Sequence, residues 1–482
     1  MLALVSVHVA VLVHVAHWRI TGRSLTPVEP SEAMQTLELG YLNAGFVLFA
    51  VAILATLVFG RFFCGWACHV VAYQDLCAWL LGKLGLRPRP IRSRTLVFVP
   101  LGAALYMFVW PQVERLLLQR GFPPLVAHFQ TDDLWASFPG PWVAALTFLV
   151  DGFLVVWLLG AKGFCTYGCP YGAVFGAVDH FAPGRIRVTD ACEGCGHCTA
   201  VCTSNVRVHE EVARHGEVVD PGCMKCTDCV SVCPKDALFF GFTPAHTTSK
   251  QKPPRIARAR RQYDFTWGEE LVLASSFLAA LFAVRGVYGA VPFLLALGLA
   301  VLAALAVMTL WRTLRNREFA LQHHVLKRSG HLTLAGGTAL ASSLLYLGLV
   351  TESAWVNYHA RTGTRLFLEG AALEPAARGP LFEASLLHLS QADRWGLFGV
   401  AAQEYQLALL LREQKDWAGA EARLRRAIEL DPEPLYPRLD LADVLIVGRR
   451  YDEAAAVLAE LVERAPDFQP ALLRLERLRN QR

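Results

Sequence analysis

Apolar segments dominate the first 350 residues, and short polar loops separate them. Seven of these segments approach the length of about 20 residues with which a helix crosses the hydrocarbon core of a bilayer. They lie at residues 2–18, 41–60, 95–111, 142–160, 269–285, 290–310 and 331–350. The first begins at Met1 without a basic segment or a small-residue cleavage site, so we expect a retained helix. The pattern predicts seven transmembrane helices.

The pattern changes after about residue 400, where amphipathic segments repeat with a period of 34 residues. The equivalent positions are Trp417, Ala420, Ala427 and Pro432 in the first copy and Tyr451, Ala454, Leu461 and Pro466 in the second, with Ala408 matched by Ala442. The period resembles the tetratricopeptide repeat, in which small residues let two helices pack closely. The alternative is a generic helical hairpin. We expect helices near 381–394 and 469–480 to cap the repeats, and a linker loop at about 356–380.

The composition indicates a membrane protein. Its mean hydropathy is +0.35 and only 18% of its 482 residues are charged, which is too apolar for a soluble protein of this size. The net charge of +5 is small. A purely soluble enzyme, a disordered regulator and a nucleic-acid binder are therefore not expected.

Basic residues in the loops indicate the orientation. The loops at 61–94, 250–261 and 312–328 together hold 17 Lys and Arg residues, whereas the intervening loops hold 5. Because cytoplasmic loops carry this excess, we expect an inner membrane protein of bacterial type, in contact with lipid, with its Cys-rich insert in the cytoplasm and residues 352–482 outside. The basic run at 250–261 is interpreted as a topology signal and not as a nucleic-acid site.

Eight of the 13 cysteines form the pattern CxxCxxCxxxC twice within 42 residues. Two-residue gaps let consecutive thiolates wrap one cubane cluster, and the distant fourth cysteine of each run reaches the other cluster in two-cluster ferredoxins. The expected ligands are Cys192, Cys195, Cys198 and Cys233 for the first 4Fe-4S cluster and Cys223, Cys226, Cys229 and Cys202 for the second. Structural zinc is the alternative, but a zinc site takes four thiolates in pairs and does not require three cysteines in succession at this spacing.

Two further pairs of the form CxxxC follow predicted spans. They are Cys64 with Cys68 and Cys165 with Cys169. A spacing of four places two thiols on one face of a helical turn, so two such turns together offer four thiolates to a metal ion or a cluster. The alternative is buried structural cysteine. Cys77 matches no pattern and is interpreted as packing.

Asp151 lies at the centre of a predicted span, where an unpaired carboxylate is costly. It is the candidate for proton or quinone chemistry, and a packing hydrogen bond is the alternative. His8, His14 and His17 lie in the first span, where imidazoles serve as haem or quinone ligands or bond the backbone.

From about residue 40 to 240 the chain resembles the membrane-bound polyferredoxins of the NapH, NosR and CcoG type. Two helices that end in CxxxC, followed by the two-cluster module, carry the resemblance. His69 replaces the proline that such proteins usually have after the first pair. The resemblance implies electron transfer between the quinone pool or a cytoplasmic donor and a redox partner protein, as in a quinol dehydrogenase subunit. The later spans and the tail are outside it.

These observations predict a membrane-embedded all-α helical bundle with an inserted α+β ferredoxin domain and a C-terminal all-α tetratricopeptide-like domain. The expected parts are a four-helix membrane domain at 1–183, the ferredoxin at 184–245, three further spans at 246–351, a linker and capping helix at 352–400, and the repeats at 401–482. The expected partners are a redox protein and a protein bound by the external repeats.

The sequence is compatible with three functions. The first is a membrane electron carrier. The second is an assembly factor that reduces copper for a respiratory oxidase or reductase. The third is a scaffold whose clusters are structural.

Overall fold

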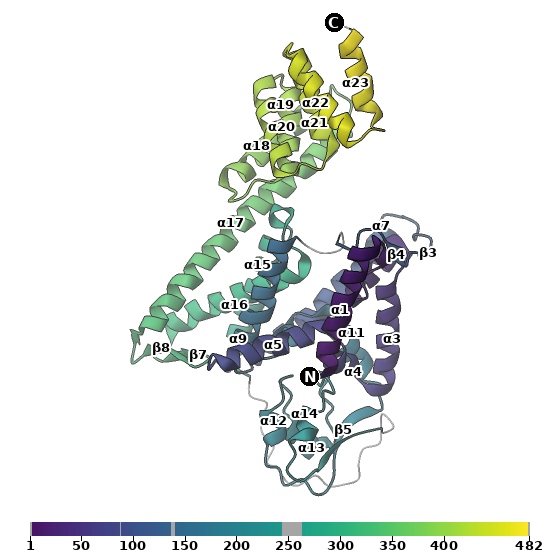
Figure 1. The fold of residues 1–482 in the computed structure, drawn as a ribbon. Helices are drawn as coiled ribbons and strands as arrows, with labels where there is room; N and C mark the ends of the chain where they lie inside the picture. Colours follow the sequence, from purple (N-terminus) through teal and green to yellow (C-terminus); the bar gives the residue numbers. More distant parts are fainter. Residues whose placement is uncertain (1, 87, 136–139, 243–262, 481–482) are drawn as a thin grey trace. The chain divides into compact units, whose positions relative to one another are not determined.

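The structure is a computed structural model that describes residues 2–86, 88–135, 140–242 and 263–480 (Figure 1). It divides into two compact units. The first comprises Met1–Leu278 and Leu297–Ser343, and the second comprises Ala279–Ala296 and Leu344–Arg482. The basic run at 250–261 lies outside the described residues.

Six helices of the described residues are long and apolar enough to cross a membrane. They are Ala3–Thr21, Leu96–Leu117, Pro141–Leu159, Trp267–Val284, Phe293–Arg315 and Leu334–Ala371. The span expected at 41–60 forms the apolar helix α3 (Ala44–Phe59), which has 16 residues and is shorter than the other six. Asn43 directly precedes α3, and its side chain accepts a hydrogen bond from the backbone N–H of Phe46 at 2.8 Å, which caps the helix.

Two of these spans contain a π-helical turn. The second span consists of η2 (Leu96–Phe98), α6 (Val99–Ala104), η3 (Leu105–Val109) and α7 (Trp110–Leu117), and the third of α8 (Pro141–Thr147), η5 (Phe148–Leu154) and α9 (Val155–Leu159). The π-helical segments are η3 and η5. Such turns are rare and are frequent at functional sites, and η5 contains Asp151.

Shorter elements complete the first unit. The first span is α1 (Leu2–Thr21), and the short helices η1 (Pro30–Glu32) and α2 (Ala33–Leu39) follow it. Short strands link the loops: β1 (Ser24–Leu25) pairs with β4 (Gln130–Thr131), β2 (Tyr41–Leu42) with β3 (Val126–Ala127), and β7 (Phe319–Leu321), β8 (His324–Arg328) and β9 (His331–Leu332) form one sheet. The spans α15 (Trp267–Val284), α16 (Phe293–Arg315) and α17 (Leu334–Ala371) continue into the second unit, and η6 (Val287–Gly289) lies between the first two.

The Cys-rich segment folds around one antiparallel pair of strands. Strand β5 (Gly184–Val188) pairs with β6 (Leu238–Phe242), with Gly184 opposite Phe242 and Val188 opposite Leu238. Short helices lie between the strands: α12 (His197–Ala200), α13 (Val208–His215) and α14 (Asp228–Ser231). Buried valines, Ile186 and Leu238 form their core. This is the mixed α+β module that the sequence predicts.

The C-terminal repeats form as expected. Consecutive helices from α18 to α23 pack side by side (Figure 1). The helices are α18 (Gly379–Trp395), α19 (Ala401–Glu413), α20 (Trp417–Leu430), α21 (Leu435–Val447), α22 (Tyr451–Arg464) and α23 (Gln469–Asn480). The small residues of the period lie between the helices, since Ala420, Ala442 and Ala454 are fully buried.

The predicted loop at 356–380 is wrong for most of its length. Helix α17 continues to Ala371, and only residues 372–378 lie between it and α18. The helix extends further because it packs against α18, and the apolar pattern of the sequence does not reveal this packing. Val356 is 1% exposed, Phe367 stacks on Phe382 at 5.7 Å, and a Cβ added to Gly363 would lie 2.7 Å from the Leu389 side chain. These residues give the helix a buried face against α18.

Candidate functional site

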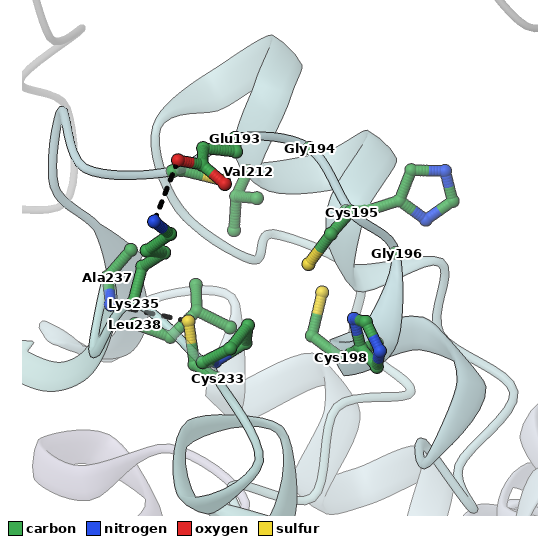
Figure 2. Close-up of a pocket in the computed structure, with 14 residues that line it drawn as sticks. Glu193, Gly194, Cys195, Gly196, Cys198, Val212, Cys233, Lys235, Ala237 and Leu238 are labelled. Atoms are coloured by element: carbon green, nitrogen blue, oxygen red, sulfur yellow. Dashed lines mark hydrogen bonds and ion pairs between the residues drawn. The ribbon is translucent and has the colours of Figure 1, made fainter.

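Four cysteines from both cysteine runs line one pocket of the ferredoxin module. These are Cys192, Cys195 and Cys198 with the distant Cys233, the set that the crossover rule predicts for the first cluster (Figure 2). Gly194 and Gly196 adopt positive φ angles of 70° and 80°, which lets the loop turn tightly between the cysteines. The backbone N–H of Ala237 points at the Cys233 sulfur at 3.3 Å.

The second predicted set is more deeply buried. Cys223 is 9% exposed and Cys229 is 7% exposed. Burial raises the pKa of the Cys229 thiol, and the neighbouring Cys223, Cys226 and Cys202 raise it further. Two cysteines of the first run, Cys202 and Cys198, also act electrostatically on Cys229, so the two runs meet at this site. The proximity of Cys202 is compatible with crossover ligation, and the ligand set of this cluster stays a prediction.

The two CxxxC pairs occur in two copies of one local structure. In each copy a five-residue helix carries the first cysteine, and the second cysteine directly precedes a longer helix. The first copy is α4 (Phe62–Trp66) with α5 (His69–Lys83), and the second is α10 (Gly163–Tyr167) with α11 (Pro170–Asp179). The sequence predicts the cysteines on one helical turn. The structure instead ends the short helix between them, so that the second cysteine of each pair lies at a helix N-terminus.

The four thiols of these pairs, named the CxxxC thiols below, lie close to one another. Cys64 and Cys165 are each 6% exposed, and both interact with Cys68 and Cys169. Burial raises the pKa of Cys68 to about 12 and of Cys169 to about 11, and the charge of Cys64 contributes to both shifts. Backbone N–H groups of the following helices oppose these shifts, since they stabilise the thiolate.

Two buried cations accompany the CxxxC thiols, and sequence reasoning missed them. Arg61 is 6% exposed and its guanidinium contacts the Cys64 sulfur at 3.9 Å. Lys162 is 1% exposed and its charge acts on Cys165. Gln74 adds a hydrogen bond from its Nε2 to the Cys165 sulfur at 2.9 Å. A signal was present in the sequence, because each cation stands three residues before the first cysteine of its pair.

The donor sets fit iron-sulfur clusters by their chemistry. Each set contains four thiols, and the thiolate is the ligand that such clusters use. In the described part of the chain, no group of three or more His, Cys, Asp or Glu side chains is arranged to hold a single metal ion. A cubane makes a different demand, because each thiolate binds its own iron at a separate corner.

Asp151 lies where the sequence places it, in the middle of a span. Its side chain is 8% exposed, and neither carboxylate oxygen has a hydrogen-bond partner among the described residues. The carboxylate faces α16, since a Cβ added to Gly298 would lie 1.9 Å from its Oδ1. The histidines of the first span differ, because His14 bonds the Leu25 carbonyl at 3.0 Å and His8 bonds the Leu4 carbonyl. Cys77 is fully buried in an apolar cluster.

Comparison with known protein families agrees with these parts. Residues 43–87 and 141–189, which contain the CxxxC pairs, match a 4Fe-4S binding domain. Residues 185–234 match a 4Fe-4S dicluster domain, and residues 411–478 match a tetratricopeptide repeat.

Individual relatives share the membrane and ferredoxin parts. The methylamine utilization ferredoxin-type protein MauN of Methylobacillus flagellatus is 33% identical over 36% of this chain and 60% of its own length. The ferredoxin-type protein NapH of Haemophilus influenzae is 28% identical over 41% of this chain and 68% of its own. The putative electron transport protein YccM of Escherichia coli is 27% identical over 47% and 62%.

The chain thus spans about 60% of the length of the MauN proteins that it matches. No solved structure matches it significantly. The chain is therefore similar, in its iron-sulfur domains and in their order, to ferredoxin-type proteins such as MauN and NapH, and it carries in addition a region that matches a tetratricopeptide repeat.

Proposed function

We propose that the protein is a membrane-bound electron carrier that passes electrons between the quinone pool, or a cytoplasmic donor, and a redox partner protein. The observation that carries this proposal is the presence of three groups of four thiols in one compact unit, beside apolar helices long enough to span a membrane. Two 4Fe-4S clusters held by the ferredoxin cysteines would each supply one-electron transfer.

The electrons balance with a quinol as donor. Oxidation of one quinol to quinone releases two electrons and two protons, and two 4Fe-4S clusters held by the ferredoxin cysteines would accept one electron each. The protons need an acceptor within the membrane. Asp151 is suited to accept one of the two, because its carboxylate is buried in a span without a hydrogen-bond partner among the described residues, and the second proton would leave to water.

The remaining parts fit a carrier that works with other proteins. Tetratricopeptide repeats bind partner segments in a concave groove and do no chemistry. The loop charges favour an inner membrane location with the ferredoxin domain in the cytoplasm and the repeats outside. We propose that the repeats recruit a protein partner on that side.

A second function is favoured by one specific observation. The CxxxC thiols are four soft ligands in a buried group, and such ligands also select Cu(I). An assembly factor would use them to reduce Cu(II) to Cu(I) with one electron from the ferredoxin. If the clusters never change oxidation state at physiological potentials, both functions are excluded and a structural role remains.

A redox titration of the purified protein separates these functions. We expect at least about eight iron and eight acid-labile sulfide per chain from the ferredoxin cysteines, and reversible reduction of both clusters by a quinol analogue. Cys195→Ser should damage the first cluster more than the second. Stoichiometric zinc without labile sulfide would overturn the ferredoxin assignment. Quinol-independent clusters that reduce Cu(II) would favour the assembly function.

A further inference from the structure

The two cysteine loops of the ferredoxin module have the same spacing but opposite surroundings. Residues 192–195 read Cys-Glu-Gly-Cys, and residues 223–226 read Cys-Met-Lys-Cys. The Glu193 side chain is 64% exposed and pairs with Lys235 at the surface (Figure 2). At the equivalent positions of the second loop, Met224 and Lys225 are each 1% exposed. One loop faces outward, whereas the other is covered.

Helix α4 covers the second loop. Met224 belongs to the same apolar cluster as Cys64 and Cys165. The indole of Trp66 donates a hydrogen bond to the Lys225 carbonyl at 3.0 Å. The approach is so close that a Cβ added to Gly65 would lie 2.4 Å from the Met224 carbonyl oxygen. The glycine between the two cysteines therefore permits this contact.

A buried ionic network fixes the loop in this position. The Lys225 ammonium lies 3.1 Å from an oxygen of Asp179, and the side chains are 1% and 2% exposed. The same carboxylate accepts a hydrogen bond from the Arg61 backbone N–H at 2.8 Å. The Arg61 guanidinium donates to the Pro221 carbonyl at 2.7 Å. Because a buried charge that loses its partner is strongly destabilising, this network sets one geometry for the loop.

Lys162 connects the two thiol groups electrostatically. Its side chain is 2% exposed, and its ammonium lies 3.8 Å from Asp75. Its charge acts on Asp75, on Cys226 and on Cys165. Cys226 belongs to the second ferredoxin set and Cys165 to the CxxxC thiols. One cation is therefore shared by the two groups.

We infer that the ferredoxin domain has a fixed orientation, in which one cysteine set lies against the CxxxC thiols and the other faces away from them. The set of Cys202, Cys223, Cys226 and Cys229 is the proximal set, which Lys225, Arg61 and Trp66 hold against the CxxxC thiols. The set of Cys192, Cys195, Cys198 and Cys233 is the distal set, which is presented to a soluble redox partner. Lys162 is a positioning residue that favours negative charge on the proximal set and on the CxxxC thiols together. This inference rests on the proposed function for its role, but the arrangement itself can be tested without a quinol.

Lysine labelling tests the covered loop. The purified full chain is treated with an amine-reactive ester, and modified peptides are followed by mass spectrometry. Lys235, with a side chain 52% exposed, should react at least tenfold faster than Lys225. In Asp179→Asn the labelling of Lys225 should accelerate at least tenfold, whereas Lys235 serves as the internal control and keeps its rate. Equal labelling of Lys225 and Lys235 in the unaltered protein would overturn the inference.

The midpoint potentials test the shared cation. Dithionite titration followed by electron paramagnetic resonance gives both potentials, which Cys195→Ser assigns to the two sets. Lys162→Met removes a buried positive charge and should lower the potential of the proximal cluster more than that of the distal cluster. Lys162→Arg keeps the charge, so its proximal cluster should have a midpoint potential close to that of the unaltered protein. A larger shift of the distal cluster, or no shift, would contradict the inference. Because dithionite supplies the electrons, the two midpoint potentials can be measured even if the protein is not reduced by quinol.

Discussion

Gly65→Ala is the smallest change that separates the ferredoxin loop from the CxxxC thiols. The added Cβ would lie 2.4 Å from the Met224 carbonyl oxygen and 3.2 Å from the Cys226 backbone, whereas ordinary contacts begin at 3.4 Å. The loop or α4 must therefore move by about 1 Å. Met224 is 1% exposed in a cluster that also contains Cys64, so this movement opens packed structure.

The expected cost follows from overpacking. Inserting a carbon into a packed contact typically costs about 1–3 kcal/mol, which corresponds to a shift of roughly 5- to 150-fold in the equilibrium between covered and open loop. Alanine is a better helix former than glycine, and in α4 this offsets at most about 1 kcal/mol. Because the clash is with a backbone atom, the upper half of the range applies, and the net cost of about 1–2 kcal/mol favours opening by roughly 5- to 30-fold.

Hydrogen exchange at the backbone amides of residues 222–226 measures this equilibrium. We expect roughly 5- to 30-fold faster exchange in Gly65→Ala, with the iron content kept. The matched control is Gly82→Ala in α5, where an added Cβ meets nothing within 4 Å and exchange should not change. Equal exchange in the two variants would refute the reasoning, because it would mean that α4 does not cover the loop.

Three further predictions concern other parts of the chain. Asp151→Asn should slow quinol-linked cluster reduction by roughly 100-fold while the iron content stays, and unchanged kinetics would assign Asp151 to packing. A reporter fused after Arg482 that is active only after export should be active, whereas a cytoplasmic signal would mean that the spans are miscounted. Leu424→Ala, at a side chain 1% exposed in α20, should lower the stability of the repeats by about 2–5 kcal/mol in thermal or chemical unfolding. The control Leu473→Ala, at a side chain 51% exposed, should change it by at most about 0.5 kcal/mol, and equal losses would contradict the repeat packing.

Local patterns in the sequence were sufficient for several parts of the fold. The spacing of the ferredoxin cysteines predicts which thiols share a pocket, because the ligand geometry of a cubane constrains that spacing directly. The period of 34 residues predicts the positions of Ala420 and Ala454 between helices, because small residues there permit close packing.

Other features depend on contacts between distant segments, which no local pattern encodes. The length of α17 is set by packing of Val356 and Gly363 against α18 and not by the apolar run alone. The pair of Asp179 with Lys225 joins residues that are 46 positions apart. Without that contact, Lys225 reads as an ordinary surface lysine within a cysteine loop.

We propose, as the central step of this function, that electrons pass between the membrane and the ferredoxin by way of a redox centre held by the CxxxC thiols. The most direct test is the rate of quinol-dependent reduction of the ferredoxin clusters in the double variant Cys68→Ser and Cys169→Ser, followed by absorbance in anaerobic membranes. Cys77→Ser, at a buried thiol outside this group, is the control. The account predicts that the double variant keeps about eight iron per chain, reduces normally with dithionite and loses reduction by quinol. Reduction by quinol at the rate of the unaltered protein would contradict it.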